Sequence, residues 1–499
     1  MRLFPTQKGK VFFLWAIFTV SVWLCATLQL QEQQYKMSYQ TLPHTLFAKV
    51  SPEPVSSPSM VVFNHALAQE LELQELTIQD WVAILSGNQP YPGQSPFSMA
   101  YAGHQYGRFT MLGDGRAHVV AELVTEQKMY DLQLKGSGST PFSRGGDGRA
   151  VLGPMLREYI ISEAMYALGV PTTRSLGVVS TGEIVYRETP LPGGILGRLA
   201  ESHIRVGTFQ YAVISGEEGL VQQLADYSIS RHYPELQNET DKYRRFLQAV
   251  IERQAKLIAK WMSIGFVHGV MNTDNMAISG QTIDYGPCAF IDTYKPEIVF
   301  SSIDRGGRYA YNQQPNIALW NLTRFAETLI SLIDKNSDIA ITKAEEDLAS
   351  FSTIYLDEYY YLMGQKLGFS NLELNHRIVI DRLLDIMHQE QLDYTQTFTS
   401  LSNETDPSSS GDYKEWFELY QQLINKDKAD PTSLMKKVNP TVIPRNHVVQ
   451  EALDLAEAGN MDLFHMILTD VQRPYEAPIE TRLLERSDSN EPFVTYCGT

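Results

Sequence analysis

The stretch His268–Asn275, "HGVMNTDN", lies just after a long amphipathic segment of the chain. Residues 241–265, "DKYRRFLQAVIERQAKLIAKWMSIG", come directly before it. Their apolar residues recur at three-and-four spacing and the segment ends at a glycine, which predicts a helix and its C-terminal cap. Two short segments after it, 275–280 and 281–286, are predicted to be strands. The stretch is therefore a polar loop between a long helix and a pair of short strands.

The acid and the amide of this loop have the residue types of a kinase catalytic loop, in which His or Gly is followed by an Asp and then by an Asn. Here Val270 stands where that Asp is expected, and Asp274 directly precedes Asn275. The loop belongs either to an inactive kinase or to an enzyme with other chemistry. Asp274 is interpreted as the base for an incoming hydroxyl, with the cap of a local turn as the alternative. His268 is expected to pack and hydrogen-bond within the loop.

Other parts of a phosphate-transfer site occur in the order that kinases use. Lys135 ends a predicted strand, and Glu158 lies in the next predicted helix, as a phosphate-binding Lys and its acidic partner do. Asn275 and Asp284 supply hard oxygen ligands, which suit Mg²⁺ or Mn²⁺ but not zinc. Each residue alone has a structural alternative, such as a solvated surface lysine. The ordered set predicts a metal-dependent nucleotide site.

Two glycine-rich stretches flank Lys135, and arginines are interleaved with them. Glycines at these places either make tight turns or let a backbone approach phosphates. Arginine presents a planar fork that fits phosphate, although pairing with acids such as Glu201 is the alternative. The candidate residues are Gly113, Gly115, Arg116, Arg144, Asp147, Gly148, Arg149, Arg198 and Arg205.

The pattern of predicted elements indicates an α+β, protein-kinase-like fold of two lobes. Strands at 116–124 and 129–135, a helix at 150–168 and strands at 174–180, 183–188 and 194–200 form a β-rich N-lobe with one long helix. A mainly helical C-lobe and a helical C-terminal extension follow. Helices are predicted at 64–86, 241–265, 316–334, 341–366, 373–391, 413–425 and 447–468. The expected divisions are a leader (1–36), a family-specific segment (37–110), the N-lobe (111–212), the C-lobe (213–400) and the extension with its tail (401–499).

Composition limits the classes of function. The 499 residues are 43% hydrophobic and 20% charged, as in globular proteins, and the formal net charge of −17 argues against nucleic-acid binding. Three cysteines, Cys25, Cys288 and Cys497, do not make a disulfide scaffold. The apolar run at 11–28 indicates a signal peptide or membrane anchor, unless translation starts at Met37. The expected location is the cytoplasm, or a membrane if residues 1–36 are translated and uncleaved.

The motifs together resemble the selenoprotein O (YdiU) family of protein adenylyltransferases. They include "YAGHQYG", "LGDGR", "LKGSGSTPFSRGGDGRAVL", "LREYIISEAM", "FVHGVMNTDNM", "DYGP" and "NPTVIPRN", in this order, from about Met37 to the C-terminus. The resemblance implies a kinase-like fold in which ATP lies flipped, so that AMP passes to Ser, Thr or Tyr hydroxyls of proteins and pyrophosphate leaves. The alternatives are a kinase-like phosphotransferase and a non-catalytic nucleotide-binding protein.

The resemblance also implies a role for each matching residue. Asp274 would accept the proton, Glu158 would orient Lys135, and Asn275 and Asp284 would hold Mg²⁺ or Mn²⁺. The implied ATP contacts are Gly113, Gly115, Arg116, Lys135, Asp147, Gly148, Arg198, Arg205 and Asp284. Animal members carry selenocysteine near the C-terminus, where this chain has Cys497, so a redox role for Cys497, with Cys288 as partner, is an open hypothesis.

Overall fold

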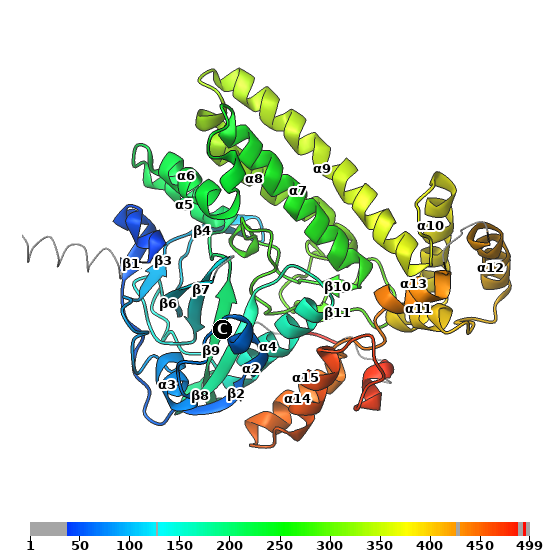
Figure 1. Cartoon of the computed structure of the whole chain (residues 1–499), viewed down its shortest axis with the longest axis horizontal. Coiled ribbons are helices and arrows are strands. Elements are labelled where there is room, and N and C mark those ends of the chain that lie inside the picture. Colours follow the sequence, from blue (N-terminus) through cyan, green and yellow to red (C-terminus); the bar gives the residue numbers. More distant parts are fainter. Residues whose placement is uncertain (1–36, 126–127, 426–429, 488–492, 496–499) are drawn as a thin grey trace, which may run out of the picture.

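The computed structural model describes residues 37–125, 128–425, 430–487 and 493–495. The predicted leader (1–36), which contains Cys25, and the C-terminal Cys497 lie outside the described residues. Figure 1 shows a sheet-containing part built from the first half of the chain and a helical part built from the second half. The fold is α+β with a helical C-terminal region, in agreement with the predicted class.

The sheet has seven strands in the order β1-β3-β6-β7-β9-β8-β2, and neighbouring strands are antiparallel. Its strands are β1 (Phe47–Lys49), β2 (Ser59–Phe63), β3 (Phe97–Met99), β6 (Ala117–Val124), β7 (Met129–Lys135), β8 (Arg174–Tyr186) and β9 (Pro190–Ala200). A separate hairpin consists of β4 (Ala102–Gln105) and β5 (Arg108–Met111). The prediction of two strands at 174–180 and 183–188 is wrong, because Gly182, at φ +72°, lets one strand continue through an irregularity in pairing.

Helix α4 (Leu152–Ala167) confirms the helix predicted at 150–168 and lies between two layers. One side packs against β8 and β9, and the other packs against α14 (Asn446–Glu457) and α15 (Asp462–Val471). A helix covered on both sides needs apolar residues around most of its circumference. This explains why even Glu158 and Arg157 are buried in it.

Three long helices form the centre of the helical part and lie side by side in Figure 1. They are α7 (Lys242–Ser263), α8 (Gln314–Ile333) and α9 (Ser337–Lys366), and they confirm the helices predicted at 241–265, 316–334 and 341–366. The loop His268–Asn275 follows α7. The two strands predicted after it are wrong: only β10 (Phe266–Val267) and β11 (Ala289–Phe290) form a pair there. The backbone of the segment between β10 and β11 instead forms single β-bridges, one to Arg205 and one to Thr172.

The other helices confirm or correct the remaining predictions. Helices α10 (Leu374–Gln389) and α12 (Gly411–Ile424) were predicted at 373–391 and 413–425. The predicted helix 64–86 is two helices, α2 (His65–Glu70) and α3 (Ile78–Leu85), and the predicted helix 447–468 is α14 and α15, separated at Gly459 (φ +93°). The sequence did not predict α5 (Val206–Ser215), α6 (Leu220–His232), α11 (Tyr394–Ser402) and α13 (Pro431–Val438).

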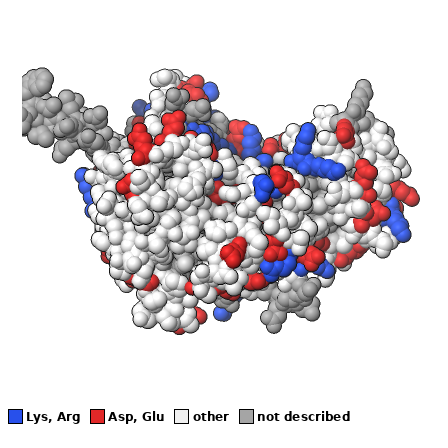
Figure 2. Space-filling model, turned by 60° about the horizontal axis from the view of Figure 1, so that its bottom comes forward, with Lys and Arg blue, Asp and Glu red and all other residues white. Residues whose placement is uncertain are grey.

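The charge distribution on the surface and the apolar character of the helices both bear on which partners the protein can bind. On the face in Figure 2, Lys and Arg side chains lie close to Asp and Glu side chains, so that charges of both signs are mixed there. Within the described parts of the chain, no helix combines the length and the apolar character that crossing a membrane requires.

Candidate active site

The predicted lysine and its acidic partner form a buried ion pair. Lys135 is the last residue of β7, and its Nζ lies 2.6 Å from Oε2 of Glu158 on α4. The same Nζ lies 3.0 Å from Oδ1 of Asp284. The side chains of Lys135 and Glu158 are only 11% and 2% exposed. The structure therefore brings together a strand, a helix and the segment after the polar loop.

Asp284 is the centre of this charge cluster. Arg198 Nη1 lies 2.5 Å from its Oδ1 and 3.1 Å from Oε1 of Glu158. Arg205 Nη1 lies 2.6 Å from Oδ2 of Asp284 and also donates to the main-chain oxygen of Asp274, at 2.7 Å. Two carboxylates are thus surrounded by three cations, and Asp284 contacts all three.

The cluster stabilises its own ionised form. Burial alone would raise the pKa of Asp284, but Arg198, Lys135 and Arg205 outweigh it and hold that pKa well below its usual value. Burial also opposes the ionisation of Glu158, yet Lys135 and Arg198 keep its pKa lowered. Both carboxylates are therefore ionised near neutral pH. The three cations exceed these two carboxylates by one charge, and Asp114 lies 3.9 Å from Arg205 as a further acid at the edge of the cluster.

Asp274 lies in the loop beside this cluster and is almost entirely buried. The residue is 7% exposed, and its Oδ1 has no hydrogen-bond partner among the described residues. Burial raises the pKa of Asp274 to about 6, although Arg205 opposes this shift. A carboxylate with an unused acceptor and a pKa near the working pH is suited to accept a proton.

Gly103 on β4 provides the space for Asp274. A Cβ atom added at Gly103 would lie 2.2 Å from Oδ1 of Asp274. Such a contact is not tolerated without movement of one of the two groups. The first glycine of "YAGHQYG", Gly103, is thus explained by its close approach to the carboxylate of Asp274.

We expect Gly103→Ala to lower transfer activity about tenfold or more, because the new methyl group pushes the Asp274 carboxylate out of position. Steady-state rates with saturating ATP measure this effect. Gly306→Ala is the matched control, since a Cβ there has no heavy atom within 4 Å. Equal rates for the two variants would show that the Asp274 position is not critical.

A pocket of about 510 Å³ adjoins the charge cluster and holds most of the other predicted residues. Its wall includes Gly113, Gly115, Arg116, Asp147, Gly148 and Asp274, together with Tyr101, Gln105 and Arg144. The pocket and the cluster meet at Tyr101, whose ring centre is 4.7 Å from Cζ of Arg205. With Arg144 and Arg149, which also line the pocket, eight of the predicted residues thus face the same space.

The glycines of this wall are required by backbone packing. Gly113 has φ +130°, and a Cβ there would lie 2.5 Å from the Phe142 ring. Gly148 has φ +66°, and a Cβ there would lie 2.1 Å from the main chain of Gly138. The first glycine-rich stretch is therefore packed against the second. These contacts support the interpretation that the glycines make tight turns, and the approach of this backbone to phosphates stays a prediction.

Two side chains of the second glycine-rich stretch, Arg149 and Asp147, are held by contacts with other segments. Arg149 donates to the main-chain oxygens of Glu53 and Pro54, at 3.2 Å each, and thereby holds the stretch against the segment before β2. Asp147 is held by two bonds from Arg187, at 2.9 and 3.0 Å. Sequence reasoning did not name Arg187, which directly follows β8, as a residue of the site.

The predicted metal ligands, Asn275 and Asp284, carry oxygen atoms of the kind that suits a hard cation. Asn275 donates its amide nitrogen to the main-chain oxygen of Val270, at 2.9 Å, which fixes the direction of its amide oxygen. The Arg205 contacts place the loop main chain next to Asp284. Among the described residues no group of three or more His, Cys, Asp or Glu side chains could hold a metal. A few oxygen ligands with substrate phosphates are the usual environment of Mg²⁺.

His268 and Cys288 have structural surroundings. His268 stacks on Trp261, with ring centres 5.3 Å apart, and its Nε2 lies 2.9 Å from the main-chain oxygen of Ile283. The expectation that His268 packs within the loop is confirmed. Cys288 is buried, and burial raises the pKa of its thiol to about 12. The thiol is therefore protonated, and the hypothesis of a pair with Cys497 falls partly outside the described residues.

We expect Lys135→Met to destabilise the protein by about 1 to 3 kcal/mol, because the buried Glu158 and the partly exposed Asp284 lose a charged hydrogen-bond donor. The same substitution should weaken nucleotide binding about ten- to a hundredfold. Lys128→Met is the matched control: Lys128 lies the same 2.6 Å from Glu201, but its side chain is 55% exposed. Loss of that surface pair should cost less than about 1 kcal/mol. Thermal unfolding and calorimetric titration separate the two cases.

Comparison with known proteins shows the family to which the chain belongs. The model of the family described as "Protein adenylyltransferase SelO" matches residues 29–472. "Protein nucleotidyltransferase YdiU" of Brevibacillus brevis is 50% identical over 476 residues, which cover 93% of this chain and 97% of the relative. The proteins of the same name from Bacillus cereus and Clostridium perfringens are also 50% identical, with the same coverage. These matches define the class as nucleotidyltransferase. The chain belongs to the protein adenylyltransferase SelO family, which confirms the resemblance seen in the sequence.

Proposed function

We propose that this protein transfers AMP from ATP to Ser, Thr or Tyr hydroxyls of other proteins and releases pyrophosphate. The observation that carries the proposal is the position of Asp274. Its buried carboxylate lines the pocket and its main chain contacts Arg205 of the charge cluster, while Val270 occupies the usual place of a kinase base. Because the acid of this loop is Asp274 and not residue 270, the site suits attack on a different phosphate from the one that kinases transfer.

The proposed architecture is the two-lobed one of protein kinases. Strands β6 to β9 with α4 correspond to the N-lobe (111–212), and α6 to α10 correspond to the C-lobe (213–400). The Lys135–Glu158 pair between a strand and a helix supports this assignment. The requirement for ATP supports a cytoplasmic location.

Residues of the charge cluster and residues of the pocket bind different parts of the nucleotide. Lys135, Arg198 and Arg205 neutralise phosphate charge, and Glu158 keeps Lys135 in place. The glycine-rich wall, with Arg116 and Asp147, contacts the remainder of the nucleotide. Asn275 and Asp284 would hold Mg²⁺ or Mn²⁺, which when bound stabilises the negative charge on the phosphates.

The proposed transfer is a displacement at the α-phosphorus. The acceptor hydroxyl gives its proton to Asp274 while its oxygen forms a bond to the α-phosphorus. The bond between the α-phosphorus and the oxygen bridging to the β-phosphate breaks, and pyrophosphate leaves with that oxygen and the electron pair. Arg198, Arg205 and Lys135 neutralise the charge that develops on the phosphates.

Labelled ATP tests the proposal directly. With the label on the α-phosphate, protein should become radioactive, and its intact mass should rise by the mass of one AMP unit per modified site. With the label on the γ-phosphate, protein should stay unlabelled. Label from the γ-phosphate alone would instead show phosphoryl transfer, and label from neither with undiminished ATP binding would show a non-catalytic nucleotide-binding protein.

A further inference from the structure

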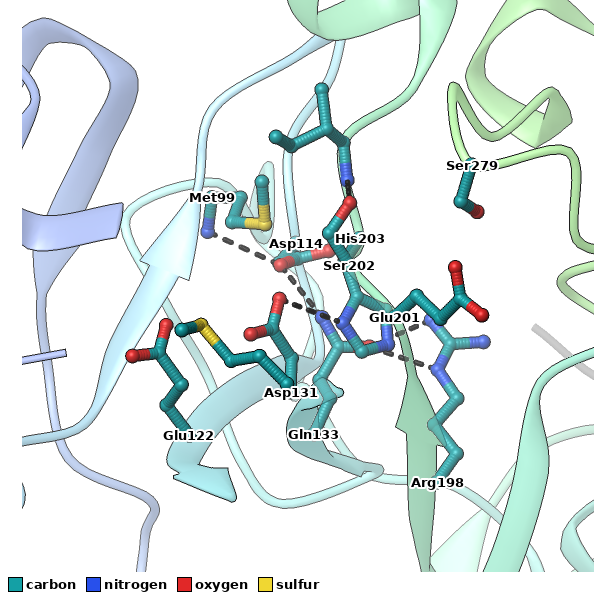
Figure 3. Close-up of polar contacts among 12 residues, drawn as sticks. Met99, Asp114, Glu122, Asp131, Gln133, Arg198, Glu201, Ser202, His203 and Ser279 are labelled. Carbon is teal, nitrogen blue, oxygen red and sulfur yellow. Dashed lines mark hydrogen bonds and ion pairs between the residues drawn. The ribbon is translucent and has the colours of Figure 1, made fainter. Parts of the chain in front are cut away.

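Gln133 lies buried behind the charge cluster and contacts one of its arginines through two bonds. It is on β7, two residues before Lys135 and directly opposite Arg198 on β9, so that all three side chains are on the same face of the sheet. Its Oε1 accepts from Nε of Arg198 at 2.9 Å and from Nη2 at 2.7 Å. Figure 3 shows this contact from Gln133 to Arg198.

Asp114 fixes the other end of Gln133. Nε2 of Gln133 donates to Oδ2 of Asp114 at 2.9 Å, and the same oxygen accepts from the main-chain nitrogen of Met99 at 3.1 Å. The main-chain nitrogen of Asp114 donates back to the oxygen of Met99, at 2.9 Å. The continuous path Met99, Asp114, Gln133, Arg198 is visible in Figure 3. Since Asp114 lies between Gly113 and Gly115, this path joins the pocket wall to the cluster.

The nitrogen atoms of the Arg198 guanidinium thereby contact two different sets of partners. Nε and Nη2 are used by Gln133, whereas Nη1 points to Glu158 and Asp284. Gln133 is a neutral acceptor, so it fixes the orientation of the fork without compensating its charge. A carboxylate at this position would add a further negative charge beside Arg198 and reduce its attraction for phosphate.

We infer that Gln133 is a positioning residue, which holds the Arg198 guanidinium in the orientation that binds a phosphate of the nucleotide. The inference rests on the proposed function for the identity of the ligand. Gln133 itself is fully buried and is not among the residues that line the pocket. Its contribution should therefore depend entirely on the presence of Arg198.

A double-mutant cycle tests this dependence. Affinity for a non-hydrolysable ATP analogue is measured by calorimetry in the full-length protein, Gln133→Met, Arg198→Met and the double variant. Gln133→Met should weaken binding roughly tenfold in the presence of Arg198 and less than about twofold in its absence. Gln133→Asn, which is shorter but keeps the amide, provides a second cycle if the Met variant folds poorly. Gln40→Met is the control, because it removes another buried amide, bonded to the oxygen of Ser95 at 2.7 Å, away from the cluster.

Each outcome decides a different question. Additive effects of the two substitutions, or an equal loss of affinity in Gln40→Met, would overturn the positioning role even if the α-phosphate label is transferred. A non-additive cycle in a protein that transfers no α-phosphate label would support the positioning role and reject the proposed function. A non-additive cycle together with α-label transfer supports both.

Discussion

Asp284→Asn should tighten nucleotide binding in the absence of divalent metal and, at the same time, abolish transfer. In the ligand-free protein Asp284 contacts Lys135, Arg198 and Arg205, so phosphates have to compete with it for these cations. Removing its charge ends the competition, and we expect metal-free affinity to rise about tenfold, or roughly 1.4 kcal/mol. Transfer is lost because a proposed metal ligand is gone.

Asparagine is the suitable replacement because Asp284 has φ +63°, a left-handed conformation that Asn tolerates and Ala does not. The loss of the buried carboxylate leaves cations facing one another and should destabilise the ligand-free protein by roughly 3 to 5 kcal/mol. In the wild type, metal and nucleotide should each strengthen the binding of the other, since phosphates release Asp284 for the metal. This coupling should be absent in Asp284→Asn.

Calorimetric titration with ATP, with and without Mg²⁺, measures both effects. Asp347→Asn is the control, because Asp347 is also a buried carboxylate, with an Arg244 partner at 2.9 Å, and lies on α9. It should lose stability without a change in nucleotide affinity. Weaker metal-free binding by Asp284→Asn would mean that Asp284 attracts the nucleotide indirectly rather than competing with its phosphates.

Asp274→Asn should lower transfer by about a hundredfold or more, because the amide cannot accept the hydroxyl proton. In the wild type the rate at limiting ATP should fall as the pH is lowered through about 6, the pKa of Asp274. The residual activity of the variant should not show this fall. Transfer of α-phosphate label across pH 5 to 8 measures the difference, with ATP binding as the check that the site is intact.

The same substitution has a stability signature of defined sign. The folded-state pKa of Asp274 is raised, so the folded protein binds this proton more tightly than the unfolded chain does. Its contribution to stability is therefore present below about pH 4 and is lost as the pH rises to about 6. The melting temperature of Asp274→Asn relative to wild type should be higher at pH 8 than at pH 4. An unchanged difference would show that Asp274 is not desolvated in the folded protein.

The local pattern of the sequence predicted those helices and strands whose formation depends mainly on neighbouring residues. The long helices were found because their apolar periodicity extends over many turns. Lys135 and Glu158 were found because one ends a predicted strand and the other lies in the predicted helix that follows it. The strands predicted after Asn275 were wrong because tertiary bridges to Arg205 and Thr172, rather than propensity, determine that backbone. Helix α5 was missed because its signal is short and its residues are largely buried.

Parts of the site could not be predicted because they depend on pairs that are distant in sequence. Gln133 looks like an ordinary strand residue until Arg198 is placed opposite it. Gly103 is explained only by Asp274, which follows much later in the chain. The motif "YAGHQYG" contained the glycine, but nothing in the motif identifies the carboxylate that it accommodates.

The packing of α4 between the sheet and the last helices gives the C-terminal region a share in catalysis. The main-chain nitrogen of Gly153, in the first turn of α4, donates to Glu457 at 3.0 Å, and Tyr159, next to Glu158, packs against Phe464 with ring centres 6.3 Å apart. The carboxylate that holds Lys135 is thus supported from residues some three hundred positions later in the chain. A nascent chain would therefore gain these contacts to α4 only after its final helices had been synthesised.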